Sequence, residues 1–404
     1  MNQDTLTADE LVTHFPIVST RLNGVEEYYF SKKLRQIDEM NQTGKKVINL
    51  GIGSPDLPPH PDVIATLQKE SAHANNHAYQ NYKGCPILRN AIADWYQKWY
   101  GVNLEPATEI LPLIGSKEGI MHICMTYLNS GDAVLIPNPG YPTYKSAAQI
   151  AGANIQVYTL DEKNDWLPDF EALEKQDLTR TKLMFVNYPH MPTGRLPTTE
   201  MFEQLIAFAK RNQILICHDN PYSFIQPGFL SSSRPSSLLS ITGAKEVVIE
   251  LNSLSKSHSM AGWRIGFLSG SENRIKEILR FKTNMDSGIF LPLQLAAAKA
   301  LQLSSEWYIS LNEIYNQRRK KVNELLELLN CTFSKEQVGL FVWAKVPDNF
   351  KDGFYLSDRV LELNNLFITP GGIFGSAGEK YIRVSLCTPE NKLEEAIQRI
   401  KNQN

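Results

Sequence analysis

The sequence has few cysteines, and no two of them form a C-x-x-C motif. The five lie far apart in a chain of 404 residues: Cys85, Cys124, Cys217, Cys331 and Cys387. Disulfide frameworks are typical of short secreted chains, and structural zinc sites need closely spaced cysteine pairs. We therefore expect free thiols in the core and predict a cytoplasmic location.

Long apolar runs and an excess of charge are also lacking. No apolar run reaches the roughly 18 residues of a membrane-spanning helix. The first residues, MNQDTLTADELVTHF, have no basic segment followed by an apolar one, so we expect no secretory signal. With 41 basic and 43 acidic side chains the net charge is -2. This balance gives no reason to expect nucleic acid or a membrane surface as a partner, and it favours a small molecule.

Two common cofactor motifs are missing as well. Gly51 and Gly53 lie close together, but no G-x-G-x-x-G opens a helix, so a nicotinamide enzyme is a weak alternative. His190, His218 and His258 lack metal spacing such as H-x-x-x-H on one helix. We expect no metal, and we interpret these histidines as surface residues or as neighbours of the site.

What is present, from about residue 109, is an alternation of short apolar runs with longer helical ones. The runs are EILPLIG, DAVLIPNP, NIQVYTL, KLMFVNYP, QILICHDN and EVVIELN. This alternation predicts an α/β fold with a parallel sheet. Ligands bind at the carboxyl ends of such strands, where several of these runs carry polar or turn residues.

The pattern changes toward the C-terminus. Residues 272–328 look mainly helical, and after them come the runs GLFVWAKV, NLFITPG and YIRVSLC and a closing helix near 390–401. The length suits two domains of average size. We predict a large domain over residues 52–290 and a smaller α+β domain formed by residues 1–51 and 291–404.

The most specific signal is the segment SLSKSHSMAGWRIGF. It places Lys256 just after a strand and Arg264 eight residues later, in a strand flanked by tryptophan and glycine. A desolvated lysine can lose its proton near neutral pH and attack an aldehyde, as a Schiff-base lysine must. A solvated loop lysine is the alternative reading of this segment.

Upstream, QILICHDNPYSF ends a buried strand with Asp219 and places Tyr222 three residues later. An aspartate at a strand end can also cap a helix. Paired with Lys256, it gains a role, because a carboxylate beside a pyridine nitrogen keeps that nitrogen protonated and makes the ring an electron sink.

Together these motifs resemble the class I/II aminotransferase family of fold type I pyridoxal-phosphate enzymes, which includes aspartate aminotransferase. Further matches cover nearly the whole chain: Gly51-Ile-Gly53-Ser-Pro55-Asp56, Tyr79 with Gly84 and Leu88-Arg89, Pro139-Gly140-Tyr141-Pro142, Pro370-Gly371-Gly372-x-Phe374-Gly375 and Arg383-Val-Ser385. The resemblance implies a large domain with a mostly parallel seven-stranded sheet flanked by helices. It also implies an aminotransferase that moves an amino group between an amino acid and a 2-oxo acid by a ping-pong mechanism.

The resemblance implies roles at the cofactor ring. Lys256 would form the Schiff base with pyridoxal 5'-phosphate and then move the proton between the substrate's α carbon and the cofactor. Asp219 would hold the ring nitrogen, Tyr222 would donate to the phenolic oxygen, and Tyr141 would stack on the ring. Asn187 is also implied to contact the cofactor.

It implies binding groups for the anionic ends as well. The phosphate would lie at the helix N-terminus formed by Gly115-Ser116-Lys117, with Ser253, Ser255 and Arg264 beside it. Tyr79 would reach the phosphate of the neighbouring subunit, so a homodimer with shared active sites is expected. Arg383 would bind the substrate's α-carboxylate through a bidentate pair, near Gly53.

The sequence departs from the family at one position. The family reads N-x-P-x-N-P-T-G, in which the second asparagine donates to the phenolic oxygen. Here the stretch runs from Asn187 to Gly194 as NYPHMPTG, so Met191 stands in its place. Methionine has no donor, and one contact is missing.

Other reactions share this fold. A pyridoxal-phosphate-dependent carbon–sulfur β-lyase is the second reading. A transcriptional regulator that uses the domain as a sensor is the third, and it would need a DNA-binding segment that we do not expect. The motifs Gly115-Ser-Lys-Glu-Gly119 and Asn284-Met-Asp-Ser-Gly288 resemble bacterial members acting on diaminopimelate, aspartate or alanine. Lys117 is a candidate for binding a distal carboxylate, and a solvent-facing lysine is the alternative.

Overall fold

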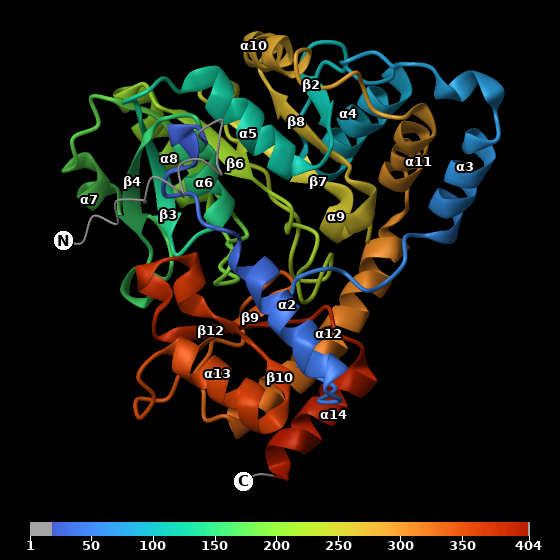
Figure 1. Ribbon diagram of the computed structural model, residues 1–404. Helices are drawn as coiled ribbons and strands as arrows, with labels where there is room; N and C mark the ends of the chain where they lie inside the picture. Colours follow the sequence, from blue (N-terminus) through green and yellow to red (C-terminus); the bar gives the residue numbers. More distant parts are fainter. Residues whose placement is uncertain (1–17, 403–404) are drawn as a thin grey trace, which may run out of the picture.

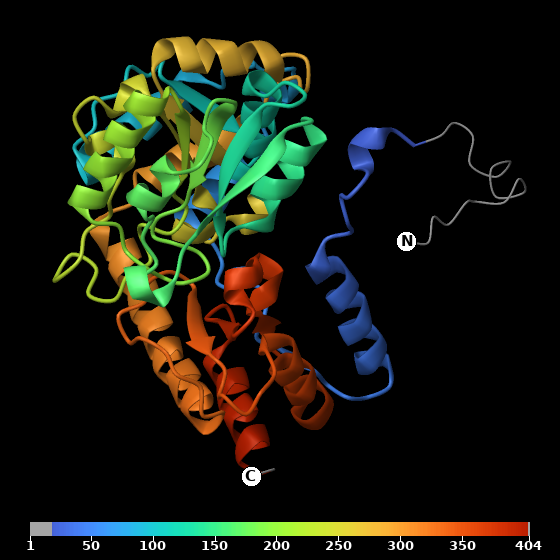
Figure 2. The ribbon, with the colours of Figure 1, turned by 90° about the vertical axis from the view of Figure 1, so that its left-hand side faces the viewer.

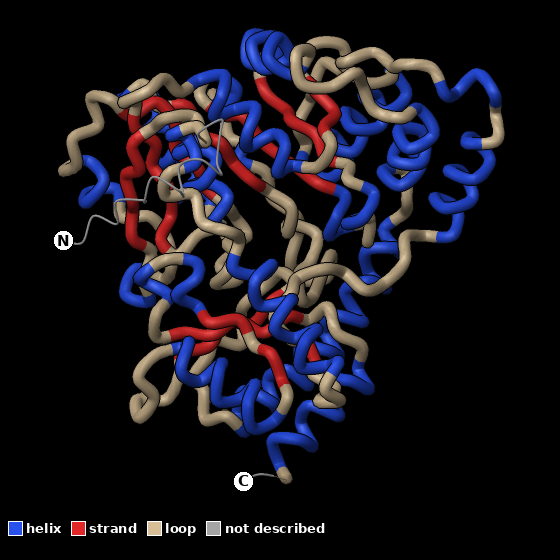
Figure 3. Tube along the Cα trace, viewed as in Figure 1, coloured by secondary structure: helices blue, strands red, loops and turns tan. Residues whose placement is uncertain are grey.

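The computed structural model describes residues 18–402, and its largest part surrounds a seven-stranded sheet (Figure 1, Figure 3). Across the sheet the strands are β2 (Ile110–Leu113), β8 (Gly266–Gly270), β7 (Val248–Ser253), β6 (Leu215–Asp219), β5 (Thr181–Val186), β3 (Ala133–Asn138) and β4 (Asn154–Thr159). Strand β8 is antiparallel to both neighbours, and the other pairs are parallel. The predicted, mostly parallel seven-stranded sheet is confirmed.

Helices pack on both faces of this sheet. One face is covered by α5 (Ser116–Tyr127), α6 (Pro142–Ile150) and α10 (Glu272–Lys282), the other by α4 (Pro86–Tyr100), α8 (Thr199–Asn212) and α11 (Leu291–Leu301). On β5, Leu183 and Phe185 pack against the face that carries α5, α6 and α10. Met184 and Val186 pack against the face that carries α4, α8 and α11. This alternation is the two-residue period of a strand buried on both faces.

A second group of elements forms a smaller layer below the sheet in Figure 1. Strands β11 (Thr369–Pro370), β12 (Tyr381–Ser385) and β9 (Phe341–Lys345) form an antiparallel sheet, and β1 (Ile48–Asn49) pairs in parallel with β10 (Leu366–Phe367). The helices around them are α2 (Tyr29–Gln42), α13 (Gly353–Asn364) and α14 (Glu390–Lys401). Figure 2 shows α2 standing beside this layer, where Ile37 packs on Leu361 and Phe367.

One long helix, α12 (Ser305–Leu328), connects the two parts. Its Tyr308 belongs to the core of the large sheet, whereas Leu311 and Tyr315 belong to that of the small sheets. The predicted division into residues 52–290 and residues 1–51 with 291–404 stays a prediction. The alanines of α11 pack into the core of the large sheet, which favours a boundary inside α12.

The remaining elements are short. They are α3 (Pro61–Ser71), α7 (Phe170–Glu174), α9 (Leu254–Ser257) and the 3-10 turns η1 (Thr20–Leu22), η2 (Ala74–His77), η3 (Glu162–Asn164), η4 (Leu238–Ser240), η5 (Ala244–Glu246), η6 (Ala261–Trp263), η7 (Gly371–Phe374) and η8 (Ser376–Gly378). All five cysteines are free thiols. Between residues 18 and 402, no helix combines the length and apolar character needed to cross a membrane.

Candidate active site

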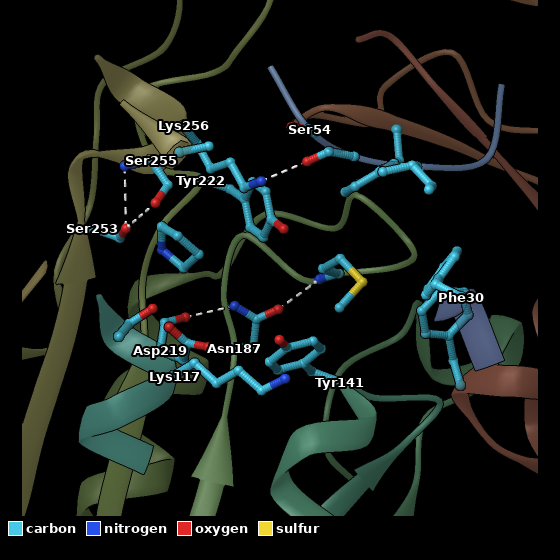
Figure 4. A pocket seen from close by; sticks show the side chains of 18 of the residues that line it. Phe30, Ser54, Lys117, Tyr141, Asn187, Asp219, Tyr222, Ser253, Ser255 and Lys256 are labelled. Atoms are coloured by element: carbon cyan, nitrogen blue, oxygen red, sulfur yellow. Dashed lines mark hydrogen bonds between the residues drawn. The ribbon is translucent and has the colours of Figure 1, made fainter. Parts of the chain in front are cut away.

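A cavity of about 440 Å³ lies at the carboxyl ends of β5, β6 and β7, between the large sheet and the smaller layer. Residues from both parts line it, including Asp219 from β6, Lys256 from α9 and Arg383 from β12. The predicted position at the carboxyl ends of parallel strands is therefore where the structure brings these side chains together (Figure 4).

Lys256 extends into the cavity from the single turn of α9, directly after β7. Its Nζ donates to the backbone oxygen of Gly53 at 2.5 Å. Burial lowers the pKa of Lys256, and the positive charges of Arg383 and Arg264 lower it further. A lysine in such a setting can act as a nucleophile and as a base, so the chemistry required of it is available.

Asp219 is the last residue of β6 and has one carboxylate oxygen without a partner. The hydroxyl of Tyr144 donates to Oδ2 at 2.8 Å, whereas Oδ1 is buried and accepts no hydrogen bond from the described residues. Burial raises the pKa of Asp219 to about 6, against the lowering effects of Tyr144 and His218. A buried acceptor with no donor is costly, and a protonated pyridine nitrogen would satisfy it.

Asn187 follows β5 and lies beside this carboxylate. Its side-chain nitrogen donates to the backbone oxygen of Asp219 at 2.5 Å, and its side-chain oxygen accepts from the backbone N–H of Met191 at 2.9 Å. Figure 4 shows these hydrogen bonds of Asn187, and Tyr141 also lines the cavity. Tyr222 lines it too, with no hydrogen bond from its hydroxyl to any residue in the described part of the chain.

Helix α5 points its N-terminus into the same cavity. Gly115 precedes it with φ +81, and a Cβ there would overlap the guanidinium of Arg264. The N–H groups that begin the helix at Ser116 and Lys117 are free for an anion. The hydroxyl of Ser253 donates to that of Ser255 at 2.9 Å on the adjacent wall.

The prediction that Arg264 lies in a strand is wrong. It lies in the turn that follows η6, with φ +54, and β8 begins at Gly266. The glycine and tryptophan around it form the 3-10 turn and not a strand. The left-handed backbone turns Arg264 toward Gly115, and its Nη1 donates to the oxygen of Ala261 at 3.0 Å.

Arg383 lies on the opposite wall and has no carboxylate partner within residues 18–402. Nη2 donates to the oxygen of Gly51 at 2.9 Å, Nη1 contacts the sulfur of Met191 at 3.3 Å, and Nε is buried without a partner. Its guanidinium carbon lies 3.8 Å from the ring centre of Phe341 and 4.6 Å from that of Phe374. Burial lowers the pKa of Arg383 to about 10. A buried cation held only by weak acceptors is suited to an incoming carboxylate.

Several predicted residues lie elsewhere or have other surroundings. Tyr79 is 91% exposed and does not line the cavity of this single chain. His190, His218 and His258 are all buried in hydrogen-bonded surroundings, so the surface reading of them is wrong. His218 bonds to Glu250 and His258 to Tyr308, which are distant in the sequence, whereas the partner of His190 is the nearby Thr193.

Other residues of the site carried no signal in the sequence, such as Tyr144 beside Asp219 and Phe341 beside Arg383. One group of three candidate metal ligands also forms among the described residues, from Glu118, His122 and Asp286. The buried ammonium of Lys282 contacts Asp286 in that cluster. These groupings join distant segments, so spacing could not find them.

Comparison with known proteins agrees with this geometry. The family described as aminotransferase class I and II matches residues 45–400. This chain belongs to the class I and II aminotransferases. It is 39% identical over 385 residues to an LL-diaminopimelate aminotransferase of Dehalococcoides mccartyi, covering 95% of this chain and 98% of that protein.

Two further relatives support the assignment. An LL-diaminopimelate aminotransferase of Aquifex aeolicus is 37% identical over 384 residues, with 95% of this chain and 98% of that protein covered. The substrate-bound structure of BacF from Bacillus subtilis superimposes with a TM-score of 0.91 at 36% identity, covering 96% and 98% of the two chains.

The protein is therefore a pyridoxal-phosphate-dependent aminotransferase of fold type I that acts on amino acids and 2-oxo acids. The β-lyase alternative finds no support in these relatives. When bound, pyridoxal phosphate supplies an aldehyde that condenses with amines and a ring that withdraws electrons. The unpartnered Oδ1 of Asp219, the free N-terminus of α5 and the buried Lys256 fit that group.

Proposed function

We propose that this aminotransferase acts on an amino acid with a second acidic group, such as a dicarboxylic or diaminodicarboxylic acid. The proposal rests on the position of Lys117. This lysine lines the same cavity as Arg383 and has no carboxylate partner among residues 18–402. Its ammonium lies 5.0 Å from the ring centre of Tyr28, and burial lowers its pKa. The names of the LL-diaminopimelate aminotransferases support this choice.

In this proposal the two ends of the substrate bind to different cations. Arg383 binds the α-carboxylate with its two nitrogens, a geometry that lysine cannot reproduce. Lys117 attracts the distal group as a flexible point charge. Lys256 carries the proton to and from the α carbon, and Gly53 supplies a backbone oxygen to Lys256 on the substrate's side of the cavity.

The remaining residues would hold the cofactor. Asp219 accepts from the ring nitrogen, Tyr222 donates to the phenolic oxygen, and Tyr141 and Asn187 border the ring. The helix N-terminus at Gly115, Ser116 and Lys117 takes the phosphate together with Ser253, Ser255 and Arg264. Support comes from the lining of one cavity by these side chains, in which Asp219 and Tyr222 still have unpaired polar atoms.

The active unit in this proposal is a homodimer with shared sites in the cytoplasm. Tyr79 is exposed on the surface, and large apolar side chains are exposed in the same two segments: Tyr82, Met285 and Phe290. These segments touch, because the ring of His77 lies 5.6 Å from that of Phe290. An exposed apolar group of this kind is typical of an interface. Sedimentation equilibrium of the protein tests whether it is a dimer. The five free thiols support the cytoplasmic location.

A spectrophotometric screen of amino donors tests the substrate class, by following loss of the cofactor's yellow band. We expect acidic donors to react best, and Lys117→Ala to lower the ratio of activities on glutamate and alanine by about tenfold, the equivalent of one charged hydrogen bond. Lys276→Ala, on the exposed side of α10, is the matched control. An unchanged ratio in Lys117→Ala would contradict the proposal.

A further inference from the structure

The loop of residues 51–56 supplies backbone oxygens to two cations of the site. The oxygen of Gly53 accepts from Nζ of Lys256 at 2.5 Å, and that of Gly51 accepts from Nη2 of Arg383 at 2.9 Å. Figure 4 shows Lys256 reaching this loop beside Ser54. The loop therefore contacts both cations.

The two ends of the loop are anchored differently. At Gly51 the chain is held by several contacts: the hydroxyl of Thr369 donates to its oxygen at 2.8 Å, and the side chain of Asn49 accepts from its N–H at 3.0 Å. Beyond Gly53, over residues 54–57, the only polar contact within the described chain is the ion pair of Asp56 with Arg318.

This ion pair has a geometry that fixes orientation. Nη1 and Nη2 of Arg318 donate to Oδ1 and Oδ2 of Asp56 at 2.6 and 2.9 Å, a bidentate arrangement. The side chain of Arg318 is 5% exposed and that of Asp56 is 23% exposed. Nη1 also donates to the oxygen of Leu386 at 3.1 Å, just after the strand that carries Arg383. The pair therefore ties the loop to α12 and to the end of β12.

We propose that Asp56 and Arg318 are positioning residues, whose ion pair holds the loop so that its carbonyls orient Lys256 and Arg383. The inference rests on the roles proposed above for these two cations. Breaking the pair releases the end of the loop that carries the Gly53 oxygen, while Gly51 keeps its other contacts. The proton-carrying lysine is then displaced more than the carboxylate-binding arginine.

The test compares three variants of the holoenzyme. Asp56→Asn removes the charge and one acceptor, and we expect kcat/KM to fall about 10²-fold, the cost of a displacement of about 1 Å. Most of the loss should appear in kcat, with a smaller rise in KM. The pH midpoint of the yellow band should also shift, because the surroundings of Lys256 change. Asp56→Glu keeps the carboxylate and should recover most of the loss.

The matched control is Glu109→Gln, which breaks a part-buried ion pair with Lys245 (2.7 Å) away from the cavity. It should lower the melting temperature and leave kcat, KM and the pH midpoint unchanged. If Asp56→Asn behaves like this control, the pair is only structural and the proposal is wrong. If Asp56→Asn does not fold, the same measurements are made on Arg318→Lys, which keeps the charge but loses the bidentate geometry. Wild-type kcat, KM and pH midpoint in that variant would likewise show that the proposal is wrong.

Failure of the proposed function has a different signature. Borohydride reduction of the wild-type protein would then attach the cofactor to a lysine other than Lys256. With the adduct on Lys256 and normal kinetics in Asp56→Asn, only the positioning role is lost.

Discussion

On the large-sheet side of the cavity, most polar groups have strong partners: Tyr144 donates to Asp219 at 2.8 Å, and Asn187 bridges Asp219 and Met191. On the small-sheet side, Arg383 has a carbonyl, a thioether and aromatic rings around it. The first wall includes the unpartnered Oδ1 of Asp219, which suits a resident cofactor. The second wall keeps a cation poorly paired, which suits a substrate that binds and leaves.

The largest expected effect tests the lysine that lies between the two walls. Lys256→Ala should lose activity by about 10⁴-fold or more, because both the nucleophile and the general base are removed. Borohydride followed by peptide mapping should place the cofactor on Lys256 in the wild type and on no residue in the variant. Lys276→Ala should behave as wild type. An adduct on a different lysine would show that Lys256 is not the residue that binds the cofactor.

A second prediction sharpens the description of the large-sheet wall through pH. In the cofactor-free protein, burial raises the pKa of Asp219 from 3.8 to about 6. The folded state then binds this proton more tightly, so the stabilising contribution is complete below pH 3.8 and is lost as the pH rises through about 6. The change is about 3 kcal/mol.

Urea unfolding of the cofactor-free protein between pH 4 and 7 measures this contribution as the difference between wild type and Asp219→Asn. The variant should lack the fall in stability over this window. Parallel pH curves for the two proteins would mean that the carboxylate is better paired than its free Oδ1 indicates.

The smallest effect concerns Met191, which touches both walls. With pyridoxal phosphate bound, a donor at position 191 would pair with its phenolic oxygen and would lower the pKa of the nitrogen through which Lys256 would hold the group. Met191→Asn should therefore lower the midpoint of the spectrophotometric pH titration by about one pKa unit, the equivalent of one neutral hydrogen bond. Met191→Leu is the control and should keep the wild-type midpoint. An unchanged or raised midpoint in the asparagine variant would show that position 191 does not stand at the phenolic oxygen, or that another group fills this role.

Local pattern was enough for much of the fold. The apolar runs KLMFVNYP, QILICHDN and EVVIELN each contain a strand of the large sheet, and the predicted helix near 390–401 is α14. These predictions hold because a strand buried on both faces appears as a short continuous apolar run, and an amphipathic helix appears as apolar residues repeating every three to four positions. Arg264 was misplaced because glycine and tryptophan also suit a 3-10 turn, and a left-handed residue leaves no periodic record.

The sequence by itself determined the family and predicted Lys256, Asp219 and Arg383 as site residues, because they stand in motifs with ordered spacing. Only the tertiary structure decided what surrounds them. The orphan oxygen of Asp219, the rings around Arg383 and the ion pair of Asp56 with Arg318 each join segments far apart in the chain. Burial and pairing depend on such long-range contacts, and local spacing carries no record of them.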